Sequence, residues 1–180
     1  MKTAGLAILI AISIATIILV IDQSTTVSSD RLVNNIVKYN GENNPVENDF
    51  SDKLAQYKSL TVTINGYNIS AFVADTDEKR SKGLSGVENM SGNQGMLFVF
   101  NNPSKQGFWM KEMKFPLDII WLDLNNSVIN IEKKLQPCTS VLFCTVYSPS
   151  RDAKYVLETI SGFSDLHSVN EGTKIKINSN

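Results

Sequence analysis

The chain has 180 residues, with 17 Lys and Arg against 18 Asp and Glu and one His, and its formal net charge is −1. This length suits one domain with an appendage. A near-zero charge excludes the basic surface that nucleic-acid binding requires, so we expect no nucleic-acid partner. A single histidine excludes sites that need two, such as the paired-histidine zinc proteases, and we predict no metal site and no cofactor.

The first segment of the chain is strongly apolar. Nineteen uncharged residues, mostly Ile, Leu, Ala and Val, lie between Lys2 and Asp22. At a helical rise of about 1.5 Å per residue, this run nearly matches a hydrocarbon core of roughly 30 Å. Because a backbone in lipid must satisfy its own hydrogen bonds, the run predicts a single transmembrane helix over residues 1–21, which contacts the membrane through residues 3–21.

The alternative for this segment is a cleaved signal peptide, whose apolar stretch is usually about 7–15 residues and ends in small residues. Here the apolar run is longer, and the polar residues 22–26 follow it without Ala. These features favour an uncleaved anchor, whereas cleavage would give a secreted protein. Lys2 and the amino group favour a cytoplasmic N-terminus. We therefore expect a single-pass protein of the cell membrane whose body faces outside.

Residues 22–57 are polar and acidic and predict a tether between the membrane and the body. The stretch 40–45 reads Asn-Gly-Glu-Asn-Asn-Pro, and such a composition cannot bury enough apolar surface to order itself. The spacing of apolar residues at 32–37 allows a short helix. A second, weaker helical stripe covers residues 50–57.

From residue 58 to 180 the apolar pattern changes from the period of a helix to that of a strand. Leu60, Val62 and Ile64 alternate with polar residues, and Asn65-Gly66 supplies the two positive-φ positions of a type I′ hairpin turn. Further strands are predicted at 69–73, 96–100, 108–113, 117–123, 128–135, 155–160 and 173–177. Short strands separated by turn signals predict a mostly β fold, a small sandwich or barrel.

One helix is predicted inside this β-rich domain. Asp75 is an N-cap acid with Glu78 three residues later, basic residues follow, and Gly83 ends the segment. The expected fold is therefore mostly β, a compact sandwich-like or barrel-like domain with one or two short helices, preceded by a single N-terminal transmembrane helix.

The chain contains two cysteines, Cys138 and Cys144. They are too far apart for a Cys-x-x-Cys redox pair. A zinc site would have to recruit His167 and a carboxylate from distant parts of the chain. In an oxidising compartment a structural disulfide is the better interpretation, so we predict a Cys138–Cys144 bridge.

Five side chains form the candidate ligand-binding site. Asp118 and Glu158 interrupt apolar runs, and a carboxylate there must be paired, because burying it alone costs several kcal/mol. We hypothesise that both acids point into one concavity, compensated by Arg80 or Lys111. Arg80 is the stronger partner because its guanidinium engages a carboxylate bidentately. Trp109 shares a strand face with Lys111 and would form the wall.

Several strings in the domain recur together in one family. They are GMLFVF at 95–100, FWMK at 108–111, PLDIIW at 116–121 and YVLE at 155–158. Over residues 60–178 the chain resembles the family named domain of unknown function 192. The resemblance implies a compact, mostly-β fold and a secreted or membrane-anchored location, but no reaction, because no activity is established for the family. Many members continue FWMK with Asn-Thr, where this chain has Glu112-Met113.

The favoured function is a non-catalytic module that binds a small molecule or an envelope protein outside the cell. The sequence shows neither a nucleophile–base pair nor a cluster of metal ligands, which weakens catalysis as an explanation. One alternative is a small envelope hydrolase that uses Asp118 and Glu158 as acid and base. Another is a purely structural envelope protein without a pocket.

Overall fold

The computed structural model describes residues 50–138 and 143–178. The chain divides into two compact units, residues 1–43 and 44–180, and every described residue belongs to the second unit. The predicted transmembrane helix and most of the predicted tether lie outside the described residues. Within the described part of the chain, no helix has the length and hydropathy to cross a bilayer.

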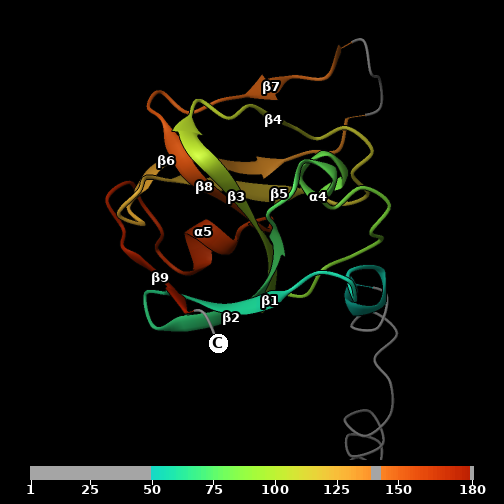
Figure 1. Ribbon diagram of the computed structural model, residues 1–180, viewed down its shortest axis with the longest axis horizontal. Coiled ribbons are helices and arrows are strands. Elements are labelled where there is room, and N and C mark those ends of the chain that lie inside the picture. The colour runs from blue at the N-terminus through green and yellow to red at the C-terminus, as the bar shows by residue number, and fades with distance from the viewer. Residues whose placement is uncertain (1–49, 139–142, 179–180) are drawn as a thin grey trace, which may run out of the picture. The chain divides into compact units, whose positions relative to one another are not determined.

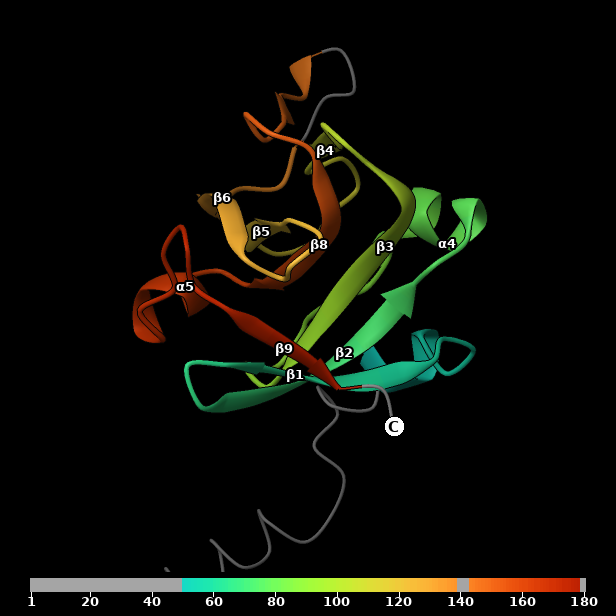
Figure 2. The ribbon, with the colours of Figure 1, turned by 60° about the vertical axis from the view of Figure 1, so that its left-hand side comes forward.

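Seven strands form one sheet in the order β6-β5-β8-β3-β2-β1-β9 (Figure 1). Neighbouring strands are antiparallel except for β2 and β3, which are parallel. Figure 2 shows that the sheet curls strongly, in the manner of a half-barrel. The fold is therefore mostly β, as the sequence predicts. The strands are β1 (Ser59–Ile64), β2 (Tyr67–Ala74), β3 (Gln94–Ser104), β5 (Leu117–Leu122), β6 (Val128–Leu135), β8 (Ala153–Ile160) and β9 (Ile175–Asn178).

The hairpin between β1 and β2 turns at the residues that the sequence indicates. Asn65 and Gly66 have φ of 47° and 83°, and Ile64 pairs with Tyr67 across the turn. The residues predicted to face inward, Val62 and Ile64, are fully buried. Positive φ at both central positions matches the twist of the flanking strands, which fixes the register of this pair.

Besides a helical turn at residues 50–53, the described domain contains two short helices and a two-stranded ribbon. The helices are α4 (Asp77–Lys82) and α5 (Phe163–Leu166), and the ribbon pairs β4 (Phe108–Trp109) with β7 (Val146–Tyr147). Helix α4 starts later than predicted, because Thr76 rather than Asp75 is its N-cap and accepts a hydrogen bond from the backbone N–H of Lys79. Gly83, with φ of 50°, ends the helix as expected.

The curled sheet separates two clusters of buried side chains. The side that we call the Trp121 face also buries Phe98, Ile119 and Val156. The opposite side, the Phe163 face, buries residues that alternate with them, namely Leu97, Ile120, Leu122 and Leu157. This alternation follows from the two-residue period of a strand.

The packed domain begins before residue 58. Phe50, Leu54 and Tyr57, which the sequence places at the end of the tether, are buried in the cluster on the Trp121 face. Residues 50–53 are helical, so the weak stripe of apolar residues at 50–57 reflects packing against the sheet rather than a spacer.

The predicted disulfide between Cys138 and Cys144 is confirmed, with a Cα–Cα distance of 5.6 Å. The backbone N–H of Cys138 donates to the carbonyl of Met110 at 2.9 Å. This contact ties the disulfide to the segment that follows β4.

Candidate functional site

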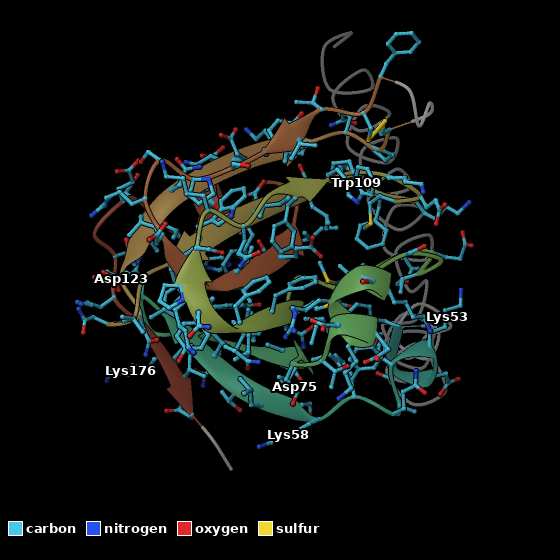
Figure 3. All side chains as sticks on the ribbon, turned by 45° about the horizontal axis from the view of Figure 1, so that its top comes forward. Lys53, Lys58, Asp75, Trp109, Asp123 and Lys176 are labelled. Carbon is cyan, nitrogen blue, oxygen red and sulfur yellow. A yellow bond between two sulfur atoms is a disulfide. The ribbon has the colours of Figure 1, made fainter. Side chains whose placement is uncertain are left out.

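A pocket of about 670 Å³ lies on the Trp121 face, between α4, the segment around β4 and the strands β3 and β8. Figure 3 shows the labelled Trp109 at one edge of the domain, with α4 below it in that view. The lining combines a set of aromatic rings with charged and hydroxyl-bearing side chains. The rings are Phe98, Phe100, Phe108 and Trp109, the charged groups are Asp77, Arg80, Lys82, Lys111, Glu112 and Glu158, and the hydroxyls are Ser81 and Ser85.

Phe108 is the centre of the aromatic wall. Its ring meets Phe98 edge-on with centroids 4.8 Å apart, and it meets the buried Trp121 at 6.0 Å. Perpendicular ring pairs of this kind are favourable because a ring edge is positive and a ring face is negative. Trp121 donates its indole N–H to the carbonyl of Gln106 at 2.9 Å, which fixes the chain just before β4. The wall is thus held in place by packing and by a hydrogen bond.

Two glycines give the pocket its shape. A Cβ at Gly83 would lie 3.4 Å from Cζ of Phe98, so α4 ends in direct contact with the aromatic wall. A Cβ at Gly107 would lie 2.8 Å from Cγ1 of Val146, a distance that side chains essentially never adopt. Gly107 therefore lets β7 approach the start of β4.

The two half-buried cations of the pocket each have an acid of their own. Arg80 donates to the Val99 carbonyl at 2.7 Å and to the carboxylate of Asp77, and its guanidinium lies 5.3 Å from the ring centroid of Phe100. The ammonium of Lys111 lies 3.6 Å from Glu112 and 5.4 Å from the ring centroid of Trp109.

The other oxygen of Glu112 is also engaged. Ser85 donates its hydroxyl to Oε2 of Glu112 at 3.0 Å. Glu112 has a φ of 59°, an uncommon conformation for a residue with a side chain. These contacts hold its carboxylate between Lys111 and Ser85 at the pocket.

Glu158 differs from the other two acids of the pocket because its Oε2 has no partner among the described residues. Its residue is only 5% exposed, and Oε2 accepts no hydrogen bond from any described group. Burial raises the pKa of the Glu158 carboxyl to about 8, since removal from water penalises the charged form. At neutral pH the pocket therefore contains a neutral carboxylic acid.

Asp118 lies outside the pocket, on the Phe163 face. It is fully buried, and its carboxylate accepts three backbone hydrogen bonds. The donors are the N–H groups of Lys134 at 2.8 Å, Gly162 at 3.0 Å and Ser164 at 2.8 Å. Asp118 thus caps the first turn of α5 and joins it to β6.

The hypothesis that both acids point into one concavity is therefore wrong. Across the β5–β8 pair, Asp118 lies opposite Thr159, whereas Glu158 lies opposite Ile119. Side chains of successive residues point to opposite faces of a sheet. On these described strands Asp118 and Glu158 therefore do not form the acid–base pair that a hydrolase would need. The partners of Asp118 are backbone N–H groups, not Arg80 or Lys111.

Comparison with known proteins identifies the family. A family model matches residues 60–177, which is more than half of the chain. The chain belongs to the DUF192 family. The family is described as an uncharacterized ACR, so membership confirms the resemblance seen in the sequence. No curated protein matches the chain.

Two crystal structures share the DUF192 chain's fold. A protein from Sinorhizobium meliloti 1021, provisionally described as a transcription regulator, matches with a TM-score of 0.62 and 22% identity over 67% of this chain and 95% of its own. A protein of unknown function from Novosphingobium aromaticivorans DSM 12444 matches with a TM-score of 0.60 and 28% identity over 67% of this chain and 84% of its own.

Four of the five predicted site residues line the pocket of this DUF192 chain. They are Arg80, Trp109, Lys111 and Glu158, and their role in binding a ligand remains a prediction. The phenylalanines of the wall and the pair Ser85 and Glu112 are not among the site residues predicted from the sequence. Glu112 was detectable as the position where the chain departs from the family's Asn-Thr, and Ser85 as a hydroxyl within a glycine-rich stretch.

Proposed function

We propose that this chain is a non-catalytic binding protein that takes a small molecule into the pocket above Glu158. The observation that carries the proposal is the unpartnered, buried Oε2 of that residue. A buried polar group without a hydrogen bond costs about 1–3 kcal/mol, so native proteins rarely retain one without a reason. A bound molecule that meets this carboxyl would supply the missing interaction.

The dimensions and lining of the pocket support the same proposal. Ligand pockets are usually concave sites of about 300–1,000 Å³ with apolar walls and a few polar groups that fix the orientation of the ligand. Here the volume is about 670 Å³, and four aromatic rings line the same pocket as Glu158. An exposed Trp109 at the edge extends the wall toward solvent.

The pocket chemistry favours binding over hydrolysis. Its other two acids are engaged, Asp77 with Arg80 and Glu112 with Lys111. Ser85 donates its hydroxyl to Glu112, whereas the chain's one histidine, His167, stacks on Tyr67 with centroids 4.0 Å apart beside α5. A serine nucleophile needs a base that accepts its proton, and no described histidine occupies that position.

We also propose that residues 1–21 anchor the protein in the cell membrane with the domain outside. The uninterrupted apolar run supports an anchor, and the Cys138–Cys144 disulfide suits an oxidising compartment. N-terminal sequencing of the native protein tests this part. A mature start after residue 20 would replace the anchor with a cleaved signal and make the protein secreted.

Ligand binding is best tested with full-length protein and the fluorescence of Trp109. This side chain is 50% exposed at the pocket, whereas Trp121 is fully buried, so a ligand should change mainly the emission of Trp109. The panel comprises sugars, amino acids, amines, nucleosides and organic acids. A binding compound should also raise Tm, because it stabilises only the folded state.

A blocking variant provides the matched control for this screen. Ser81→Phe places a ring at the pocket, and Glu78→Phe places the same ring on an exposed position of the same helix that does not line the pocket. Binding should disappear in the first variant and persist in the second. Equal binding by both variants, or no binding by any compound of the panel, would contradict the proposed binding function. A purely structural protein would then be the better explanation.

A further inference from the structure

Of the three acids that line the pocket, Asp77 and Glu112 are paired with cations, whereas Oε2 of Glu158 has no partner among the described residues. On the flanking strands, its register partners Met96 and Ile119 are apolar. The charged side chains that face the pocket come from α4 and from the segment after β4. They are Asp77, Arg80, Lys82, Lys111 and Glu112.

None of these cations compensates Glu158. Arg80 pairs with Asp77, Lys111 pairs with Glu112, and Lys82 is exposed. Oε2 of Glu158 has no hydrogen-bond partner among the described residues, and burial raises the pKa of its carboxyl. The buried acid of the pocket therefore has no counter-ion within the described part of the chain.

The aromatic rings that line the pocket together with Glu158 favour a positive charge. The face of an aromatic ring carries negative potential and attracts ammonium and guanidinium groups within about 6 Å. Two rings of this pocket already show the preference, because Arg80 lies over Phe100 and Lys111 lies over Trp109. Phe98 and Phe108 line the same pocket, and no described cation lies over them.

We propose that the ligand of this pocket carries a protonated primary or secondary amine, which pairs with the carboxylate of Glu158 among the aromatic rings. This inference rests on the proposed binding function of the pocket. An ammonium N–H would donate to Oε2 of Glu158, and the carboxyl would release its proton to solvent. Ligand binding thus converts a neutral buried acid into one half of an ion pair.

The exchange of a proton gives the inference a specific pH dependence. With a pKa of about 8 for Glu158, the free protein is about 90% protonated at pH 7, so amine binding should release about 0.9 proton there. Affinity should fall about tenfold for each pH unit below 7 and level off above pH 8, as long as the amine itself stays protonated.

Matched probes that differ only in charge test the proposal on the full-length protein. One set is 2-phenylethylamine, 2-phenylethanol and phenylacetate, and the other is cyclohexylmethylamine, cyclohexylmethanol and cyclohexanecarboxylate. Calorimetry in buffers of different ionisation enthalpy reports affinity and proton release together. We expect an amine to bind at least tenfold more tightly than its alcohol and its acid, with proton release at pH 7.

Glu158→Gln isolates the charge from the shape of the side chain. Gln is neutral like the protonated Glu158 but need not take up a proton on folding at pH 7, so the variant should fold with a Tm at or above that of the wild type. It should bind amines at least tenfold more weakly and release no proton.

Glu171→Gln makes the same change on an exposed residue that does not line the pocket, and it should bind amines as the wild type does.

The outcomes separate this inference from the proposed function. If an alcohol or an acid binds, no amine binds, and Ser81→Phe abolishes that binding, the inference is overturned but the binding function is retained. Equal amine binding by wild type and Glu158→Gln would also overturn it. Failure of all six probes overturns the inference, and failure of the wider panel as well removes the binding function.

Discussion

Asp118 and Glu158 lie on adjacent strands but point to opposite faces of the sheet, because Glu158 is opposite Ile119 and Asp118 is opposite Thr159. The offset of one residue gives the two acids different surroundings. Asp118 is satisfied by three backbone N–H groups, whereas Oε2 of Glu158 has no partner among the described residues. One acid therefore supports the fold, and the other is available to a ligand.

Replacement of Asp118 should destabilise the protein strongly. Asp118→Ala would leave three backbone donors without their acceptor, at about 1–3 kcal/mol for each buried group. We expect the free energy of unfolding to fall by at least about 3 kcal/mol in urea titrations. Asp152→Ala, on an exposed residue, is the control and should change stability by less than about 0.5 kcal/mol. A loss below about 1 kcal/mol for Asp118→Ala would contradict the capping role.

The geometry around Asp118 also explains what the sequence could not predict. Lys134 has a φ of 56° at an irregularity in the pairing of β5 with β6, and its N–H donates to Asp118. A bulge of this kind re-aims a backbone group and shifts the register locally. Alternation along a single strand shows which residues share a face, but it does not show how two strands align. The faces of Asp118 and Glu158 relative to each other could not be derived without that alignment.

Local features were more accessible to sequence reasoning. The Asn65-Gly66 turn, the end of α4 at Gly83 and the disulfide all depend on residues that are close in the chain, and the structure shows each of them. The pocket depends instead on Phe98, Phe108 and Glu158, which three separate strands bring together. The FWMK string at 108–111 indicated one side of the pocket, but the residues of the opposite side could be identified only from the folded structure.

Substitution of Gly95 should disturb the strands that position Glu158. A Cβ at this position would lie 2.8 Å from the backbone carbonyl oxygen of Glu158 and 3.3 Å from Cδ1 of Ile69. Backbone atoms cannot move aside as a flexible side chain can, so Gly95→Ala should cost about 1–3 kcal/mol of stability.

Gly92→Ala is the matched control for this change, because a Cβ there meets nothing within 4 Å. It should alter the free energy of unfolding by less than about 0.5 kcal/mol. Urea titrations of both variants give the comparison. Similar stability of the two variants would show that β3 and β8 can separate without cost.

Loss of the disulfide should lower stability modestly. Cys138 and Cys144 are six positions apart in the chain, and closing such a short loop contributes near the low end of about 2–4 kcal/mol. The double variant Cys138→Ser, Cys144→Ser should therefore lose about 2 kcal/mol in urea titrations. Treatment of the wild type with reductant should give a loss of similar size, and reductant should leave the double variant unchanged. A reductant effect on that variant would point to a cause other than the disulfide.

Glu158 should make the stability of the protein depend on pH in a direction opposite to that of an ordinary carboxylate. Its pKa is about 8 in the folded protein, against an ordinary value of 4.5 for a glutamate carboxyl. Between these values the folded state holds a proton that the unfolded state has lost, so its contribution is fully present below pH 4.5 and is lost as the pH rises to 8.

The comparison that tests this effect is between the wild type and Glu158→Gln at pH 5, 6, 7, 8 and 9. The stability of the wild type relative to the variant should fall by up to about 1.4 kcal/mol per pH unit through this range and then level off above pH 8. Taking the difference cancels the titration of other groups, such as Asp165, whose pKa is lowered to about 2 by Lys133 and Lys134. A difference that stays constant or rises with pH would show that Glu158 is already charged in the folded protein. Amine binding would then release no proton, and the pH dependence inferred for the pocket would be wrong.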